Sequence, residues 1–372
     1  MWPITEAKNS TAKLCESRSM LKNLTTSQVG GPADQLVVAG TEEELVSALA
    51  TADAAGTPVL LIGGGSNLVI NDRGFRGTAI QIATRGLQLE ALGTNTLLLR
   101  VAAGENWDAC VEYSLVEGLS GLEALSGIPG CAGATPVQNV GAYGADVSQH
   151  LAWARVYDRH LGTALTLHRE ELEFSYRDSL IKRTSVAGSP RFVVLEVAFE
   201  LTRSEDSAPI RYAELARRMG VAPGESALAQ LVRQQVLELR RSKGMVYETK
   251  DVDSHSTGSF FTNPIVDVSV LERLPEGAPN YPVDTDGLVK LSAAWLIDQA
   301  GFSKGFGLEG TEGFGLAQGR ASLSTKHTLA VTNRGAASAE DLLTVARAVR
   351  AGVQERFGIE LVNEPLLIDL AL

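Results

Sequence analysis

Two glycine-rich segments have the residue types to bind the phosphates and the flat ring system of a nucleotide cofactor. The first, Gly63 to Asn67, reads GGGSN, follows an apolar run, and offers consecutive backbone N–H groups without Cβ obstruction. Taken alone, it fits a tight solvent loop equally well. The second, residues 128–144, is long, weakly charged and punctuated by glycine, which favours wrapping around a flat ligand over an exposed loop. Two such segments indicate a dinucleotide-sized ligand.

Other cofactor and metal motifs are weaker or missing in the sequence. No G-x-x-x-x-G-K-[ST] pattern occurs, which excludes a P-loop. A G-x-G-x-x-G match at 305–310 follows an expected helix rather than a strand, so we interpret it as a glycine-rich loop and not as a Rossmann site. The five histidines, at positions 150, 160, 168, 255 and 327, lack metal-ligand spacing. We therefore expect no bound metal.

The first glycine segment must be positioned by the elements that precede it. A β-rich run at 36–38 comes before Thr41, which begins a helix with a capping box to Glu44, and Gly56 ends this helix. A strand over 58–62 then leads directly into the glycines. This order of strand, helix and strand is typical of an α/β fold and places the glycines at the carboxyl end of a strand.

The rest of the chain predicts a second glycine-rich lobe and a third lobe. Strands are expected at 78–82, 96–101 and 192–201, a helix at 107–115, and a polar linker at 204–210. Amphipathic helices are expected at 228–239, 291–298 and 342–357, and a strand-like end at 359–372. Trp107 and Tyr143 are candidates for ring stacking, although Trp107 also fits a core position. We interpret the chain as two glycine-rich α/β lobes that share one ligand, with a separate α/β lobe over them.

Composition and charge exclude several classes of protein. The chain has 372 residues, 33 Lys+Arg against 44 Asp+Glu, a formal charge of −11 and no basic block, so no nucleic-acid partner is expected. Its three cysteines, Cys15, Cys110 and Cys131, are scattered, which favours a reducing compartment over a disulfide framework. No stretch reaches the ~18 apolar residues needed to span a bilayer. We expect a cytoplasmic protein, without membrane contact, whose residues 1–20 form a loose leader.

Several longer motifs resemble one enzyme family in order and spacing. They are PVLLIGGGSNLVIND, GLEALSGIPGCAGATPVQNVGAYG, FSYRDS, GSFFTNP, PNYP followed by VKLSAAWLID, LSTKHTLAVTN and LVNEP. Together they span residues 24–367 and resemble the UDP-N-acetylenolpyruvoylglucosamine reductases, the MurB family. The resemblance implies a mixed α+β and α/β chain. A two-subdomain FAD-binding domain of the PCMH type covers 21–203, with subdomains at about 21–76 and 77–203. A MurB-type C-terminal α/β substrate-binding domain covers 204–372, and its final strand returns Glu364 to the active site.

The resemblance also implies a reaction. NADPH reduces FAD, which then reduces the enolpyruvyl ether of UDP-GlcNAc to UDP-N-acetylmuramate for peptidoglycan precursor synthesis. Hydride adds to the terminal CH₂ of an alkene conjugated with a carboxylate, so negative charge builds on the adjacent carbon. Such a site needs a cation, hydrogen-bond donors and a proton source. The resemblance assigns carboxylate binding to Arg177, proton donation to Ser259 and a further catalytic role to Glu364, and we expect a monomer.

Other residues match the family's ligand-binding positions. For FAD these are Gly63, Gly64, Gly65, Ser66, Asn67, Leu68, Gly130, Gly133, Ala134, Thr135, Asn139, Gly141 and Tyr143. For the substrate they are Tyr176, Tyr212, Lys243, Asn263 and Lys290. Two features depart from the family pattern: Leu366 stands where an arginine sometimes occurs, and the glycine-rich segment 305–319 is longer than expected.

Two other functions stay open on the sequence. Another FAD oxidoreductase of the same binding fold, such as a hydroxy-acid or sugar oxidase, would share the glycine segments, but such proteins lack SYRDS, GSFF and LVNEP together. A flavin- or nucleotide-binding module without catalysis would carry damage at Arg177, Ser259 or Glu364. All three residues are intact.

Overall fold

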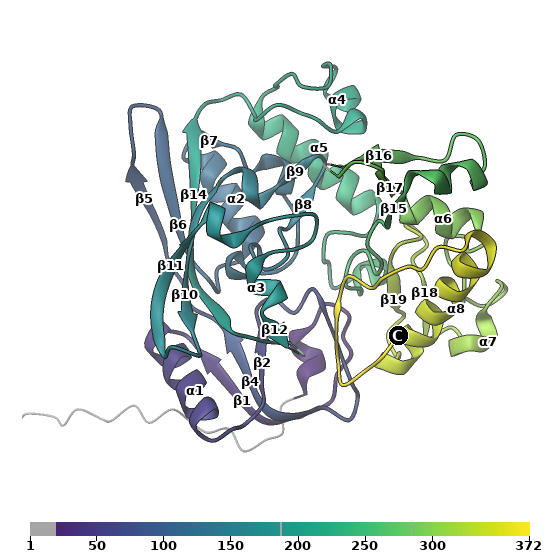
Figure 1. Cartoon of the computed structure of the whole chain (residues 1–372), viewed down its shortest axis with the longest axis horizontal. Coiled ribbons are helices and arrows are strands. Elements are labelled where there is room, and N and C mark those ends of the chain that lie inside the picture. Colours follow the sequence, from purple (N-terminus) through teal and green to yellow (C-terminus); the bar gives the residue numbers. More distant parts are fainter. Residues whose placement is uncertain (1–19, 187, 284) are drawn as a thin grey trace, which may run out of the picture.

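The N-terminal part of the molecule is a small parallel sheet covered by one helix. The computed structural model describes residues 20–186, 188–283 and 285–372, so the expected leader lies outside the described residues except for Met20. The strands β1 (Ala33–Ala39), β4 (Phe75–Ile82) and β2 (Val59–Ile62) form the sheet in that order, and both outer strands run parallel to β4. Helix α1 (Glu42–Ala54) connects β1 to β2 and has the predicted capping box between Thr41 and Glu44. Its buried leucines pack on the sheet, which is at the lower left in Figure 1.

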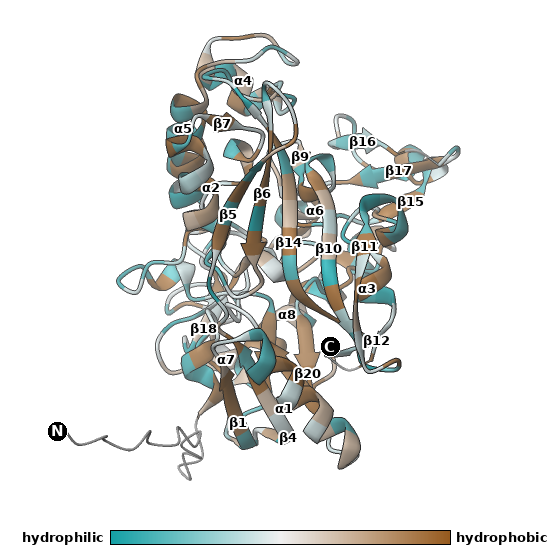
Figure 2. Cartoon of the chain, turned by 90° about the vertical axis from the view of Figure 1, so that its left-hand side faces the viewer, coloured by the Kyte–Doolittle hydropathy of each residue, from teal (hydrophilic) through white to brown (hydrophobic). Residues whose placement is uncertain are grey.

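A larger antiparallel sheet forms the second part. Its strands are β5 (Leu87–Ala91), β6 (Thr96–Ala102), β10 (Leu151–Asp158), β11 (Thr163–His168) and β14 (Phe192–Arg203), in the order β11-β10-β14-β6-β5, with β7 (Leu119–Ser120) on β14. Figure 2 shows these strands side by side in that order. Helix α2 (Trp107–Val116) packs on this sheet, where Trp107 is fully buried and makes an edge contact with Phe199. The sequence pattern predicted β14, β6 and α2 but not the β10–β11 hairpin.

The glycine-rich segment 128–144 has little regular structure. Near its end lies the short strand β8 (Gly141–Ala142), which pairs with β9 (Ala145–Asp146) just after the segment. Helix α3 (Leu180–Arg183) and the pair β12 (Ser185–Val186) and β13 (Ser189–Pro190) complete this region. The backbone polar groups of this irregular segment bond within the segment and to residues around it, as in Gly133 N–H to Ala103 O at 2.9 Å.

Helices dominate the third part. It contains α4 (Ala213–Met219), α5 (Ala229–Ser242), α6 (Ala293–Gln299), α7 (Phe314–Ala317) and α8 (Ala339–Phe357). Strands β15 (Ile265–Asp267), β17 (Leu288–Leu291) and β16 (Asn280–Pro282) form one small sheet in that order, and β18 (Ala321–Leu323) pairs with β19 (Val331–Asn333). The long helix α8 buries one face against α6, β18 and β19. No helix among the described residues is long and apolar enough to cross a membrane.

Two sequence-based boundaries were wrong. Helix α6 begins at Ala293 after the Ser292 cap, because Leu291 belongs to β17 and pairs with Asn280. At the C-terminus only β20 (Leu366–Ile368) is a strand. Pro365 has no N–H to extend the ladder, and Asp369 has φ +53°, which ends it.

The short strand β20 brings the C-terminal segment into contact with the N-terminal part of the chain. It runs parallel to β3 (Leu68–Ile70), the strand that follows the first glycine segment. Figure 1 shows the yellow C-terminal segment returning from α8 toward the purple N-terminal strands. This pairing fixes the residues just before β20 beside Asn67, since Leu366 N–H donates to Asn67 O at 2.9 Å.

Candidate active site

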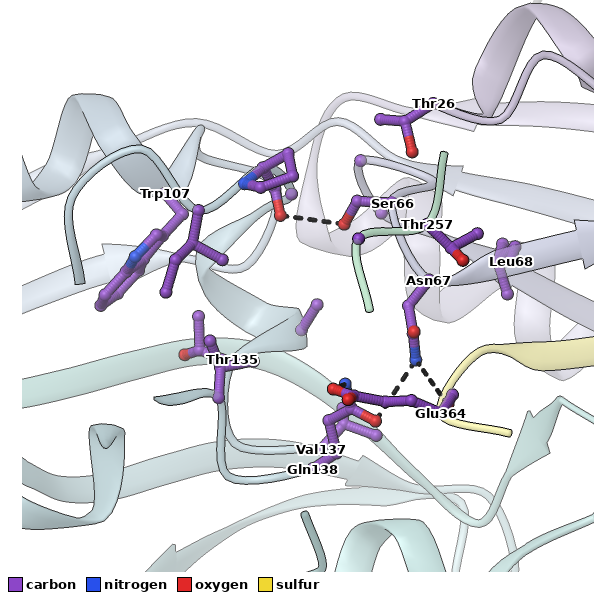
Figure 3. A pocket seen from close by; sticks show the side chains of 18 of the residues that line it. Thr26, Ser66, Asn67, Leu68, Trp107, Thr135, Val137, Gln138, Thr257 and Glu364 are labelled. Atoms are coloured by element: carbon purple, nitrogen blue, oxygen red, sulfur yellow. Dashed lines mark hydrogen bonds between the residues drawn. The ribbon is translucent and has the colours of Figure 1, made fainter. Parts of the chain in front are cut away.

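A cavity of about 730 Å³ lies where the three parts of the molecule meet. Both glycine-rich segments line it, together with residues from α5, the 254–259 segment and the C-terminal segment (Figure 3). The two glycine segments touch each other, because Ser66 Oγ donates to Pro129 O at 2.9 Å. Backbone approaches closely here: a Cβ on Gly64 would lie 2.5 Å from Gly130 Cα, and one on Gly63 would collide with Cys131 Sγ. Glycine is therefore needed at both positions.

Arg177 and Glu364 form an ion pair on the cavity wall. Arg177 Nε donates to Glu364 Oε1 at 2.8 Å, and the two side chains are 21% and 14% exposed. The other guanidinium nitrogens donate to Gly141 O at 2.8 Å and Asn139 O at 3.3 Å. Lys182 Nζ donates to the Arg177 carbonyl at 2.7 Å, and burial lowers the pKa of this lysine. Since a guanidinium has five N–H groups, two remain for a ligand.

The backbone of Glu364 is held from both sides. Its N–H donates to Phe260 O at 2.9 Å, and Asn67 Nδ2 donates to its carbonyl at 3.4 Å. Gln138 Nε2 donates to the carboxylate at 3.3 Å. The dashed lines in the lower part of Figure 3 run from Asn67 to Gln138 and Glu364. Glu364 is therefore connected to both the first glycine segment and the segment that carries Ser259.

Ser259 lies on the same cavity, and its hydroxyl makes no hydrogen bond within the described residues. The next two residues, Phe260 and Phe261, are fully buried and pack edge to face at 5.2 Å. They anchor Ser259 on the core of the third part.

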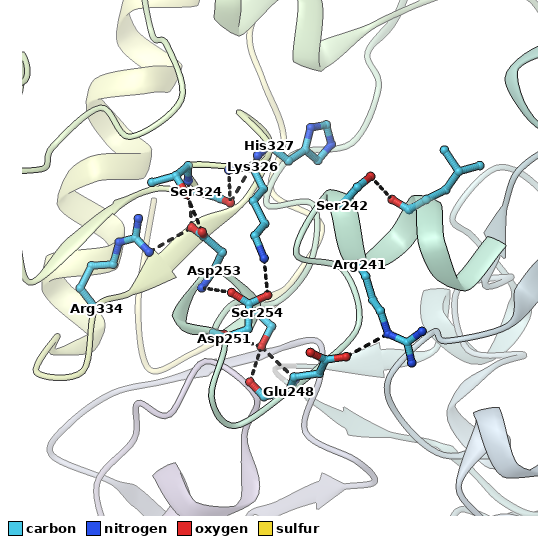
Figure 4. A network of polar contacts seen from close by, with 12 residues as sticks. Arg241, Ser242, Glu248, Asp251, Asp253, Ser254, Ser324, Lys326, His327 and Arg334 are labelled. Atoms are coloured by element: carbon cyan, nitrogen blue, oxygen red, sulfur yellow. Dashed lines mark hydrogen bonds and ion pairs between the residues drawn. The ribbon is translucent and has the colours of Figure 1, made fainter. Parts of the chain in front are cut away.

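The loop before Ser259 is fixed by a buried polar network (Figure 4). The carboxylate of Asp253 accepts hydrogen bonds from Thr325 N–H at 2.8 Å and from Arg334 Nη1 at 3.0 Å. These partners lower the pKa of Asp253 although burial opposes them. Lys326 pairs with Asp251 at 2.7 Å in the same network. The network gives the loop a defined position.

Positive charge gathers at one end of the cavity. Arg240 is buried, which lowers its pKa, and it donates to Met245 O at 2.7 Å. Lys243 Nζ lies 5.9 Å from the ring of Tyr143, which packs edge to face on Tyr212. Burial raises the pKa of Tyr143 to about 12. For His327, burial and then the charges of two lysines lower the pKa to about 4, so its imidazole is neutral at pH 7. This end suits an anionic ligand.

Three further candidates form a cluster. Lys290 Nζ lies 4.6 Å from the ring centre of Tyr176, whose hydroxyl accepts a hydrogen bond from Asn263 N–H at 3.3 Å. Asn263 Oδ1 accepts from Ala293 N–H at the start of α6. Burial and, second, the charge of Arg177 lower the pKa of Lys290. Asn263 lines the cavity, whereas Tyr176 and Lys290 are not among the residues that line it.

The cavity brings together most of the residues proposed from the sequence. Its lining includes Arg177, Ser259, Glu364, Gly63, Gly64, Gly65, Ser66, Asn67, Leu68, Gly130, Gly133, Ala134, Thr135, Gly141, Tyr143, Tyr212, Lys243 and Asn263. Asn139 is not in the lining, because its side chain is bonded to Ser148 N and Ser175 O behind the wall. Trp107 reaches the cavity but is fixed in the core, with Nε1 donating to Leu125 O at 3.0 Å.

Sequence reasoning missed several cavity residues. They are Gln138, Lys182, Arg240, Thr257 and His327. Gln138 is a polar residue inside the second glycine segment, and Arg240 precedes Lys243 by three residues on the end of α5. Both residues could therefore have been proposed as candidates from the sequence. The described residues contain no group of side chains that could hold a metal ion, and both described cysteines, Cys110 and Cys131, are free thiols.

Comparisons with known proteins agree with this geometry. Residues 33–168 match the model of an FAD binding domain. Together with reductase relatives about 48% identical over 95% of the chain, this match shows an FAD-dependent oxidoreductase. Residues 250–368 match the model of the UDP-N-acetylenolpyruvoylglucosamine reductase C-terminal domain. The chain belongs to the UDP-N-acetylenolpyruvoylglucosamine reductase (MurB) family.

Relatives with this name match over nearly the whole chain. The Thermobifida fusca reductase is 48% identical over 361 residues, covering 95% of this chain and 97% of the relative. The Streptomyces coelicolor reductase is 50% identical over 363 residues, covering 95% and 90%. The crystal structure of MurB from Thermus caldophilus has a TM-score of 0.62 at 26% identity and covers 94% of this chain and 98% of its own. The predicted fold class, an FAD-binding domain followed by a MurB C-terminal domain, is confirmed.

The residues that line the cavity are also suited to bind FAD, independently of the comparisons with known proteins. One wall is formed by glycine backbone, which lets a pyrophosphate approach N–H groups closely. Beside Asn67 and Leu68 the cavity also holds a buried hydroxyl, Thr257 Oγ1, that has no partner among the described residues (Figure 3). Gly63 to Leu68 would lie along the diphosphate, and the residues from Gly130 to Tyr143 would form the second side.

Proposed function

We propose that the chain reduces UDP-N-acetyl-enolpyruvoylglucosamine to UDP-N-acetylmuramate, with NADPH as reductant and with Arg177, Ser259 and Glu364 as the catalytic residues. The observation that carries this proposal is that these three residues, from distant parts of the chain, share one cavity with the glycine segments. Bound FAD would supply hydride transfer, from NADPH and then to the terminal CH₂ of the substrate. The chain's own residues must then stabilise and protonate the product of that transfer.

Arg177 would stabilise the negative charge. Hydride addition leaves an electron pair on the carbon next to the substrate carboxylate, and that charge spreads into the carboxylate oxygens. The two guanidinium N–H groups not used by Glu364 and the carbonyls can hold a carboxylate in a fork. The guanidinium is already oriented by its protein partners, so no reorganisation is needed as charge develops.

Ser259 would supply the proton. Its O–H bond breaks as the new C–H bond forms at the carbon that carries the electron pair, and solvent returns the proton to the serine. An alcohol is a weak acid, but the carbanion is basic enough to take its proton. The free hydroxyl supports this role, because it makes no hydrogen bond within the described part of the chain that would hold it away from the ligand. Glu364 would orient Arg177 through their ion pair, and a proton shared between Glu364 and the substrate carboxylate would let the two lie side by side.

The cationic end of the cavity would bind the UDP part of the substrate. Lys243 and Tyr212 lie at this end, Arg240 adds a buried positive charge, and Asn263 lines the same cavity. Lys290 and Tyr176 would support Asn263 from behind. We further propose that the protein acts in the cytoplasm as a monomer. Free thiols at Cys110 and Cys131 favour a reducing compartment.

An anaerobic spectroscopic experiment tests this function. The purified holoprotein should show an oxidised flavin spectrum that NADPH bleaches and that UDP-N-acetyl-enolpyruvoylglucosamine restores, with a product heavier by two hydrogen atoms. NADH in place of NADPH tests the preference for the reductant. If the enol ether fails to restore the colour while a hydroxy acid or sugar bleaches it, the protein is an oxidase on the same FAD-binding fold.

A further inference from the structure

Thr257 presents a buried hydroxyl with nothing to bond. The residue is 9% exposed and lines the cavity, and its Oγ1 has no hydrogen-bond partner among the described residues. A buried hydroxyl that stays unpaired is destabilising, so native structures rarely keep one without a reason. A ligand that enters this cavity can provide the missing partner.

The residues around Thr257 indicate which part of the ligand its hydroxyl would contact. The preceding carbonyl, Ser256 O, accepts a hydrogen bond from Thr26 Oγ1 at 2.6 Å, and Ser27 Oγ donates to Leu68 O at 3.3 Å. These bonds hold Thr257 against the FAD-binding part, next to Asn67 and Leu68 (Figure 3). The Thr257 hydroxyl therefore faces the flavin side of the cavity.

Thr257 also lies close in the sequence to Ser259, the proposed proton donor. Only Gly258 separates it from Ser259, and this glycine has φ +73°, so the two side chains sit on one short, sharply turned segment. A hydrogen bond from Thr257 to the flavin would fix the distance between the ring and the Ser259 hydroxyl. The isoalloxazine ring has suitable partners in the carbonyl oxygens and ring nitrogens of its polar edge.

We propose that Thr257 is a flavin-positioning residue whose hydroxyl hydrogen-bonds the polar edge of the isoalloxazine ring of bound FAD. This inference rests on the bound flavin and not on the identity of the nucleotide substrate or of the reductant. It therefore survives or fails independently of the proposed reaction.

Three variants of the holoenzyme test the proposal. Thr257→Val keeps the shape and removes the hydroxyl, and we expect FAD to dissociate about tenfold faster, the equivalent of one ordinary hydrogen bond. The visible spectrum and midpoint potential of the flavin should shift as well. Thr257→Ser keeps the hydroxyl and should match the wild type in all three. Thr257→Ala should resemble Thr257→Val, so the Ala and Ser pair decides the outcome if the valine variant does not fold.

A matched control separates this effect from the general loss of a buried threonine hydroxyl. Thr78 on β4 is 5% exposed and lies outside the cavity lining, with Oγ1 3.4 Å from Gln35 Oε1. Thr78→Val should leave the flavin spectrum, potential and dissociation rate unchanged. The proposal is overturned if Thr257→Val and Thr257→Ala behave as the wild type in these measurements, if they alter only the KM of the nucleotide substrate, or if Thr257→Ser shares their defect.

Discussion

Arg177 and Glu364 are 187 residues apart in the sequence, yet Nε of the arginine lies 2.8 Å from Oε1 of the glutamate. The pairing of β3 with β20 makes this contact possible, because it returns the chain to the first glycine segment just after Glu364. The arginine is thereby held in one orientation by a carboxylate and two backbone carbonyls. A substrate carboxylate would meet a cation that is already fixed in place.

Replacing Arg177 by lysine should lower kcat and raise KM together. Lysine keeps the charge but loses the fork and the bonds that orient it, and we expect kcat/KM to fall about 10²–10³-fold, typical of a lost charge-stabilising donor. Steady-state kinetics with the enolpyruvyl nucleotide measures this. Arg183→Lys is the control, since Arg183 pairs with the exposed Glu173 in the same region. An unchanged kcat/KM in Arg177→Lys would remove Arg177 from the charge-stabilising role.

Replacing Gly64 by alanine should expel FAD. The new Cβ would lie 2.5 Å from Gly130 Cα, and backbone atoms cannot rotate away as a side chain can. The two glycine segments must then separate. The ratio of FAD to protein after purification measures the effect. Gly93→Ala should keep a full complement of FAD, because no atom lies within 4 Å of a Cβ there. Full FAD content in Gly64→Ala would show that this contact does not shape the cofactor site.

His327 should make the protein less stable in mild acid. Its pKa falls from 6.5 to about 4 in the folded state, mainly through burial. Between these values the unfolded chain binds a proton that the folded chain does not, so stability falls as pH drops from about 6.5 toward 4. His327→Gln removes this protonation of the unfolded chain. The Tm of the variant should therefore decline less than that of the wild type over this range, and the two Tm profiles should have equal slopes above pH 7. The exposed His160→Gln should follow the wild type. Parallel Tm profiles for wild type and His327→Gln would contradict the buried, neutral imidazole.

Local patterns in the sequence predicted the first part of the fold well. The Thr41 and Glu44 capping box marks the start of α1, and the glycine segment follows β2 as predicted. These signals are local: a cap, a period and a turn. The over-long strand predicted at the C-terminus has two origins: Pro365 is a local stop that the prediction did not use, and β20 forms only where β3 is available to pair with it, a partner that no local pattern encodes.

The candidate site, like the fold, was predicted from the sequence only in part. Motif resemblance named Arg177, Ser259 and Glu364, and the structure gathers all three on one cavity. Burial cannot be read from residue types, so the desolvated Arg240 and the unpartnered Thr257 hydroxyl were not predicted. Asn139 illustrates the reverse case. A polar residue in a cofactor motif instead bonds the backbone at Ser148 and supports the wall with its side chain.

The most direct test of the mechanism is to follow the two half-reactions of Ser259→Ala by anaerobic stopped flow. NADPH should bleach the flavin at the wild-type rate, because this step needs no proton from Ser259. Reoxidation by UDP-N-acetyl-enolpyruvoylglucosamine should slow by about 10²–10⁴-fold, the usual contribution of a positioned proton donor. Wild-type reoxidation, or an equal loss in both half-reactions, would contradict the role of Ser259 as the acid.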